Sequence, residues 1–126
     1  MGNSYSIANH DDVKDTVTRR GLLIHIMDNK QQVLIHGTIH ADIEEESINN
    51  AINKNEFDKP VIIYGKNTHA IEALVKKQKQ LASLGFKNVK IYIGGLFEWT
   101  LLQDIYGSKE FPLYGIKGPV DPIQYM

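Results

Sequence analysis

One segment of the sequence has the residue types of a loop that binds anions. A β-branched run, residues 60–64, leads directly into this loop, and the apolar residues after the loop recur at helical spacing. The loop consists of Gly65, Lys66, Asn67, Thr68, His69 and Ala70. Free amides at the N-terminus of the following helix would attract an anion, and Lys66 would add positive charge. The same residues also suit a structural role, in which Gly65 makes a tight turn and Thr68 caps the helix. The residues alone leave both interpretations open.

Histidine is the second residue type here that suits chemistry, as a metal ligand or a proton shuttle. The chain has five histidines, at His10, His25, His36, His40 and His69. Only His36 and His40 are close in sequence, and no carboxylate accompanies them at the spacing of a zinc-binding helix. We therefore expect no metal site and no acid–base role. Phe97 and Trp99 follow a Gly-Gly turn on a predicted short helix, where we expect them to pack in the core.

The composition excludes several classes of function. The chain has no cysteine, which rules out a disulfide, a zinc–thiolate site, palmitoylation and a thiol nucleophile. A net charge of -1 and an isoelectric point near 6.5 provide no basic surplus, so nucleic acid is not an expected partner. No cofactor is expected either.

The first six residues fit a lipidation signal. Met1, Gly2 and Ser6 match the pattern for N-myristoylation, which would acylate Gly2 in a eukaryotic or eukaryote-infecting setting. A single myristoyl chain binds membranes with an association constant on the order of 10⁴ M⁻¹, and the chain has no cysteine for a second acyl group. Any membrane contact through this lipid would be reversible. The pattern is short enough to occur by chance.

Strands alternate with helices around the loop. The pattern predicts helices over 7–20, 42–52, 71–84 and 96–104, and strands over 22–27, 32–35, 60–64 and 88–93. Such alternation is typical of an α/β domain with a mostly parallel sheet covered by helices on both faces. Ligands of such sheets bind at the carboxyl ends of the strands, where the loop at Gly65 would lie.

Residues 111–126 form an apolar tail that is too rich in proline and glycine for a helix. Its apolar side chains need cover, and we expect its first half to pack on the domain. The side chains expected to be buried are Leu113, Tyr114, Ile116 and Val120. The end from Asp121 is expected to remain available to a partner.

Two motifs in the second half carry a family resemblance. Residues 84–89 read Leu-Gly-Phe-Lys-Asn-Val and residues 92–99 read Tyr-Ile-Gly-Gly-Leu-Phe-Glu-Trp. They resemble the rhodanese-like family, whose C-terminal half has a GF-x-x-V strand entry and a GG-x-x-x-W turn. The strand 23–26 and the segment 37–41 fit the same family in order. The resemblance implies a single rhodanese-like domain over residues 7–110, with a central, mostly parallel five-stranded sheet and helices on both faces.

The resemblance also implies that the family's chemistry is missing. Active members carry a persulfide on a cysteine that follows the strand matching residues 61–64, and that position here is Gly65. The loop has no arginine, because the only two, Arg19 and Arg20, precede the first core strand. The cysteine and the arginine on which sulfur transfer and the phosphatase reaction of the same fold depend are therefore both missing from the loop. The chain is thus similar to catalytically inactive, Cys-less members, and residues 101–107 resemble a Cys-less group of large DNA viruses and protists.

The expected function is a protein–protein interaction or structural module, located in the cytoplasm, at a membrane or in a virion. The alternative is an enzyme of changed chemistry that uses Gly65–His69 as an anion site, with Lys66, Thr68 or His69 as the reacting group. A pocket at the loop that is open and lined by convergent reacting groups would favour the enzyme, and a filled one the module. The identity of the protein partner does not follow from the sequence.

Overall fold

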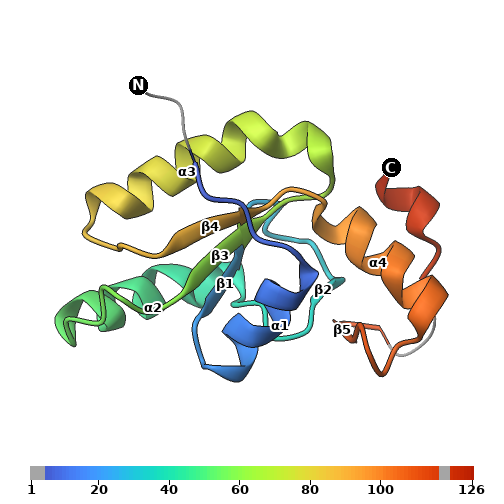
Figure 1. Cartoon of the computed structure of the whole chain (residues 1–126), viewed down its shortest axis with the longest axis horizontal. Helices are drawn as coiled ribbons and strands as arrows, with labels where there is room; N and C mark the ends of the chain where they lie inside the picture. Colours follow the sequence, from blue (N-terminus) through green and yellow to red (C-terminus); the bar gives the residue numbers. More distant parts are fainter. Residues whose placement is uncertain (1–4, 117–119) are drawn as a thin grey trace.

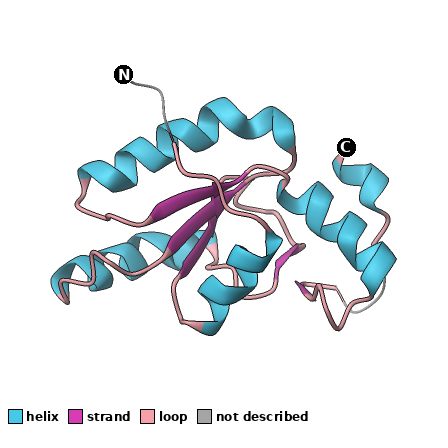
Figure 2. Cartoon of the chain, in the orientation of Figure 1, coloured by secondary structure: helices cyan, strands magenta, loops and turns pink. Residues whose placement is uncertain are grey.

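A three-stranded parallel sheet lies at the centre of the chain, with helices around it (Figures 1 and 2). The computed structural model describes residues 5–116 and 120–126. The elements follow in this order: α1 (His10–Thr18), β1 (Leu22–His25), β2 (Leu34–Ile35), α2 (Ala41–Asn53), β3 (Val61–Tyr64), η1 (Thr68–Ala70), α3 (Ile71–Ser83), β4 (Val89–Tyr92), α4 (Gly95–Tyr106), β5 (Leu113–Tyr114) and η2 (Pro122–Tyr125). The predicted α/β class and its helices on both faces are confirmed.

The central strand is β3, which pairs in parallel with β1 on one side and β4 on the other. All four of its residues are buried, because helices cover both of its faces. Alternate residues of the sheet therefore enter two separate cores. One core is aliphatic for the most part and lies against α2 and α3, and the other is rich in aromatic rings and lies against α1, α4 and the tail. The register places His25, Tyr64 and Tyr92 in one row at the carboxyl ends of the strands.

The five strands do not form one sheet. Three of them make the parallel sheet, and β2 pairs with β5 as a separate antiparallel ribbon. The physical reason lies in the partners of the β2 backbone. The amide of Ile35 donates to the Tyr64 hydroxyl, at 3.1 Å, and the amide of His36 donates to the carbonyl of Pro112, also at 3.1 Å. The strand thus turns toward the tail and away from the edge of β1.

The segment before α1 lies along β4. The amide of Ile91 donates to the carbonyl of Ser6, and the amide of Ala8 donates to the carbonyl of Ile91, at 2.9 and 2.8 Å. Ile7 is recorded as a parallel bridge to Ile91. Asn9 then begins α1 with a capping box, in which its side chain and that of Asp12 bond reciprocally to each other's amides.

The tail packs differently from the prediction. Val120 is buried and Leu113 is half-buried as expected, but Tyr114 and Ile116 are exposed. The end of the tail, expected to be available, is instead held down, because Pro122 and Tyr125 are buried where η2 packs on α4 (Figure 1). Two-residue pairing in β5 turns the Tyr114 side chain outward, where it contacts the ring of His40 edge-on.

Candidate functional site

The loop between β3 and α3 is ordered from within by one residue. Asn67 is the N-cap of η1: its side-chain oxygen accepts a hydrogen bond from the amide of His69, at 2.9 Å, and its carbonyl accepts from Ala70, at 3.2 Å. The structural interpretation of the sequence gave Thr68 as the cap, whereas the structure has Asn67 as the side-chain cap, one position earlier. Asparagine serves well as a cap because its side chain reaches the amide two residues on. Two loop amides that an anion would need are thereby occupied.

The other side of the loop is fixed by the start of α4. The amides of Leu96 and Phe97 donate to the carbonyls of Gly65 and Lys66, at 3.0 and 2.9 Å. This close approach requires glycine at position 95, which has a φ of +62° and whose added Cβ would overlap the Gly65 carbonyl oxygen. The Gly-Gly turn thus positions the backbone of the loop, and Trp99 and Phe97 pack in the core as predicted.

A side chain at position 65 would crowd Ala70. A Cβ built on Gly65 would lie 2.7 Å from the Cβ of Ala70 and 3.5 Å from Cγ1 of Ile26. Beside it is an open pocket of about 390 Å³ with mainly apolar walls. Its lining residues are Ile26, Met27, Asp28, Gln31, Gly65, Lys66, Ala70 and Ala73. Lys66 and His69 are exposed, so the loop presents polar side chains to solvent and gathers none of them around a buried centre.

The loop also contacts the tail, which sequence reasoning missed. The side-chain amide of Asn67 donates to the carbonyl of Tyr125, at 2.9 Å, across 58 positions of the chain. Asn67 is 9% exposed, so this bond is largely shielded from solvent. The only signal in the sequence was the apolar character of the tail itself, which shows that it must be covered but not by what.

The histidines do not form a site. Within residues 5–116 and 120–126, no group of three or more histidine or acidic side chains is placed to hold a metal ion. His25 is buried, and its Nδ1 accepts from the amide of Met27, at 3.1 Å. Burial lowers the pKa of His25, while Glu44 acts in the opposite direction and His40 adds to the lowering. The ring of His10 packs edge-on against Phe111.

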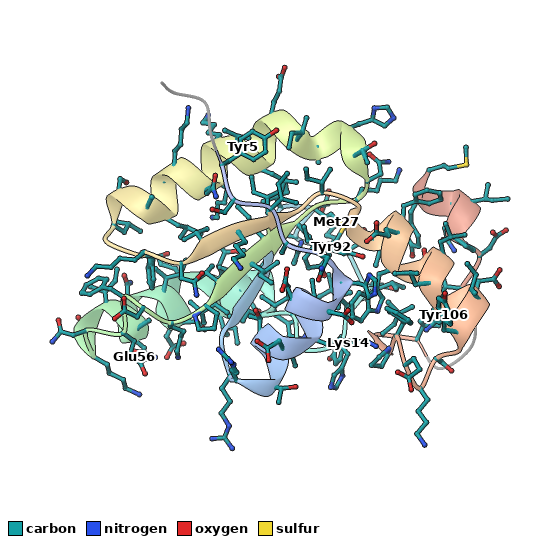
Figure 3. All side chains as sticks on the ribbon, in the orientation of Figure 1. Tyr5, Lys14, Met27, Glu56, Tyr92 and Tyr106 are labelled. Carbon is teal, nitrogen blue, oxygen red and sulfur yellow. The ribbon has the colours of Figure 1, made fainter. Side chains whose placement is uncertain are left out.

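Two buried tyrosines beside the loop differ in their hydrogen bonding (Figure 3 labels Tyr92). The Tyr64 hydroxyl accepts from the amide of Ile35 and lies 2.7 Å from Oγ1 of Thr38. The Tyr92 hydroxyl is buried and makes no hydrogen bond of good geometry in the described part of the chain, although the carboxylate of Glu98 lies beside it. Burial raises the pKa of both, and for Tyr92 the carboxylate of Glu98 raises the pKa further. Both phenols are therefore neutral at physiological pH.

A parallel sheet with helices on both faces, and a strand–loop–helix unit whose loop has no cysteine, define an α/β domain. The Rhodanese-like domain model matches residues 18–102. The chain therefore belongs to the rhodanese-like domain family, as its motifs predicted, and it contains no cysteine. A search of curated proteins finds no match.

Solved structures from Anabaena sp. share the fold. The solution structure of the rhodanese-like domain of the Alr3790 protein is similar with a TM-score of 0.62 and 19% identity, over 94% of this chain and 87% of that chain. A crystal structure of the Alr3790 protein gives 0.61 and 18%, over 94% and 83% of the two chains. The crystal structure of the Rhodanese_3 like domain from the same protein gives 0.53 and 21%, over 74% and 97%. At these identities the similarity shows the fold alone.

The predicted lipidation residue, Gly2, lies outside the described residues. Within the residues described, no helix is long and apolar enough to span a bilayer.

Proposed function

We propose that this chain is a catalytically inactive rhodanese-like domain that works as a protein–protein interaction module. The observation that carries the proposal is the loop after β3, which has glycine where the family resemblance places cysteine. A Cβ added at Gly65 would lie 2.7 Å from the Cβ of Ala70, so a larger side chain at this position requires a shift of its neighbour. Without a thiol the chain has no group to carry a persulfide.

The surface of α4 and η2 supports the interaction role. These two elements pack on each other, and each keeps large apolar side chains exposed. Leu101 and Ile105 are 40% and 63% exposed on α4, Ile123 is 68% exposed on η2, and Met126, directly after η2, is 71% exposed. Exposed apolar side chains on two elements that pack together can contribute to a protein contact surface.

The test combines an activity assay with a capture experiment. Purified full-length chain is expected to show no turnover of thiosulfate or mercaptopyruvate above a no-protein blank. Gly65→Cys is expected to stay inactive, because the new Cβ conflicts with Ala70 and the loop amides are already bonded to Asn67. Turnover by the unmodified chain, or recovery to the rates of active relatives in Gly65→Cys, would contradict the proposal.

The capture experiment uses two matched surface variants. Ile105→Lys on α4 is expected to lose a protein partner that the unmodified chain retains from its native source. Leu84→Lys, at the end of α3 and 49% exposed, serves as the control and should retain it. Equal loss in both variants would place the interaction elsewhere.

The alternative of an enzyme with an anion site at Gly65–His69 is less well supported. Two of the loop amides are bonded to Asn67, and two of its carbonyls are bonded to α4. The proposal extends to location: we place the module in the cytoplasm or in a virion, with reversible membrane contact through a myristoylated Gly2. Mass spectrometry of the N-terminal peptide from native eukaryotic material tests the lipid. An unmodified Gly2 would contradict the proposed membrane contact.

A further inference from the structure

An open cavity of about 290 Å³ lies where four segments that are distant in the chain meet. It is bordered by α1, by the turn after β2, by α4 and by the residues just before β5, and none of its lining residues belongs to the Gly65–Ala70 loop. Its walls are mainly apolar, with Val17, Trp99 and Pro112 among them. Its volume is at the lower end of the range for small-molecule sites, so the cavity suits a ligand with one small apolar group.

Hydrogen bonds and close packing hold the walls of this cavity in place. The carbonyl of Pro112 accepts two bonds, one from Nε1 of Trp99 at 3.0 Å and one from the amide of His36 at 3.1 Å. Gly37, with a φ of +93°, lets the turn approach α1, because an added Cβ would lie 2.7 Å from a methyl group of Val17. The site is therefore formed before a ligand arrives, and binding does not have to order it.

Two lysines give this cavity an excess of positive charge. Lys14, labelled in Figure 3, and Lys109 line it together with one carboxylate, that of Glu110. Nζ of Lys14 lies 3.5 Å from Oε2 of Glu110 and 4.1 Å from the centroid of the Phe111 ring. The side chains of this ion pair are 34% and 64% exposed, so the pair contributes little to stability and is easily exchanged. Lys109 is paired with no carboxylate in the described part of the chain.

We propose that this cavity binds a small carboxylate with an apolar body, such as an arylalkanoic acid. The apolar group contacts Val17 and Pro112 beside the edge of Trp99. The ligand carboxylate binds Lys109 and takes the place of the Glu110 carboxylate at Lys14. Apolar walls with a few placed charges are typical of small-molecule sites. The inference goes beyond the proposed function, because it concerns a small molecule and a cavity that the exposed apolar side chains of α4 and η2 do not line.

The test uses the full-length chain, labelled with ¹⁵N, and three probes: 3-phenylpropionate, its uncharged analogue 3-phenylpropanamide, and acetate. Trp99 is the only tryptophan of the chain, so its indole N–H gives a single resonance that reports on this cavity. 3-Phenylpropionate is expected to shift this resonance and the amides of Val17 and Lys109, with a dissociation constant on the order of millimolar. The amide analogue should bind at least about threefold more weakly, and acetate should give no saturable shift.

The same titration overturns the proposal in two ways. The first is the lack of a saturable shift with 3-phenylpropionate at about ten times the expected dissociation constant. The second is equal affinity for the uncharged analogue, which would mean that the lysines do not recognise the carboxylate.

Variants of the charged residues separate this site from general apolar binding. Lys14→Met and Lys109→Met keep a long side chain and remove its charge, and each should weaken the binding of 3-phenylpropionate by about threefold. Glu110→Gln removes the competing carboxylate and should strengthen binding by about twofold. Lys30→Met, at an exposed lysine that does not line the cavity, is the matched control and should leave the affinity unchanged.

Lys109→Met keeps the test valid if Lys14→Met loses stability together with its contact to Phe111. An unchanged affinity in Lys109→Met, an unchanged or weaker affinity in Glu110→Gln, or an equal loss in Lys30→Met would overturn the assignment.

Discussion

The two faces of the parallel sheet are built in different ways. The face toward α2 and α3 is filled mainly by aliphatic side chains, with Phe86 as the one aromatic ring among its buried described residues. The face toward α1 and α4 carries five buried aromatic residues, Tyr64, Tyr92, Trp99, Phe111 and Tyr125. The aliphatic face is covered by two helices, α2 and α3. The aromatic face combines helices with the distant tail and includes buried polar groups that need hydrogen-bond partners. Single substitutions on this face should therefore differ more from one another in their effect on stability.

Trp99 is expected to give the largest effect. Its side chain is 2% exposed, contacts the rings of Tyr92 and Phe111 edge-on, and donates to the carbonyl of Pro112. Trp99→Ala should lower the free energy of unfolding by about 3–5 kcal/mol. Leu74→Ala, at a fully buried position of the aliphatic face, should cost about 2–4 kcal/mol. Urea denaturation, monitored by circular dichroism, measures the free energy of unfolding of both variants. A cost below about 1 kcal/mol for Trp99→Ala would mean that the aromatic face adds little stability.

The end of the tail should give the next largest effect. Tyr125 is 7% exposed and Ile123, two residues before it, is 68% exposed. Tyr125→Ala should cost about 2 kcal/mol through lost burial, whereas Ile123→Ala should stay within about 0.5 kcal/mol. Thermal unfolding of the two variants gives the comparison. Similar melting temperatures would show that η2 is not held by its anchor.

The two tyrosines in one row of the sheet should respond in opposite ways to loss of the hydroxyl. Tyr64→Phe leaves the buried amide of Ile35 without its acceptor and should cost about 1–2 kcal/mol. Tyr92→Phe removes a hydroxyl that makes no hydrogen bond of good geometry in the described residues, and should be neutral or stabilising by up to about 1 kcal/mol. Equal losses in denaturant titrations would indicate a partner for the Tyr92 hydroxyl, such as the carboxylate of Glu98.

The smallest expected effect depends on pH. Burial lowers the pKa of His25 below its usual value of 6.5, so the unfolded chain takes up a proton before the folded chain does. The resulting stability is complete above pH 6.5 and is lost as pH falls through the folded-state pKa. His25→Gln should flatten the decrease in stability between pH 7 and 5. An unchanged slope would assign the acid sensitivity to other groups.

The sequence predicted the aliphatic face better than the aromatic one. Residues 71–84 and 60–64 have local periodicity, and the structure places α3 and β3 there within a few residues. The pairing of β2 with β5 could not be predicted, because it depends on where Ile35 finds an acceptor, 29 positions away at Tyr64. A strand of two residues is also too short to show an alternating pattern.

The candidate loop was located correctly, but its internal order was not. Its position after a buried strand and before a helix followed from the pattern around Gly65. The cap is Asn67 and not Thr68, because the short helix η1 precedes α3. The sequence pattern does not indicate η1. The bond from Asn67 to Tyr125 joins segments that only the fold brings together. Long-range contacts of this kind decide whether a loop is open.

The segment at Ser6–Ala8 has a consequence for how the chain behaves at high concentration. A parallel strand with an open edge offers unpaired amides and carbonyls to a neighbouring molecule, which is a common start of aggregation. Here the backbone of Ile91 in β4 is already bonded to Ser6 and Ala8. The residues just before α1 thereby cover part of that edge. They do so through main-chain hydrogen bonds, which persist through almost any change of side chain.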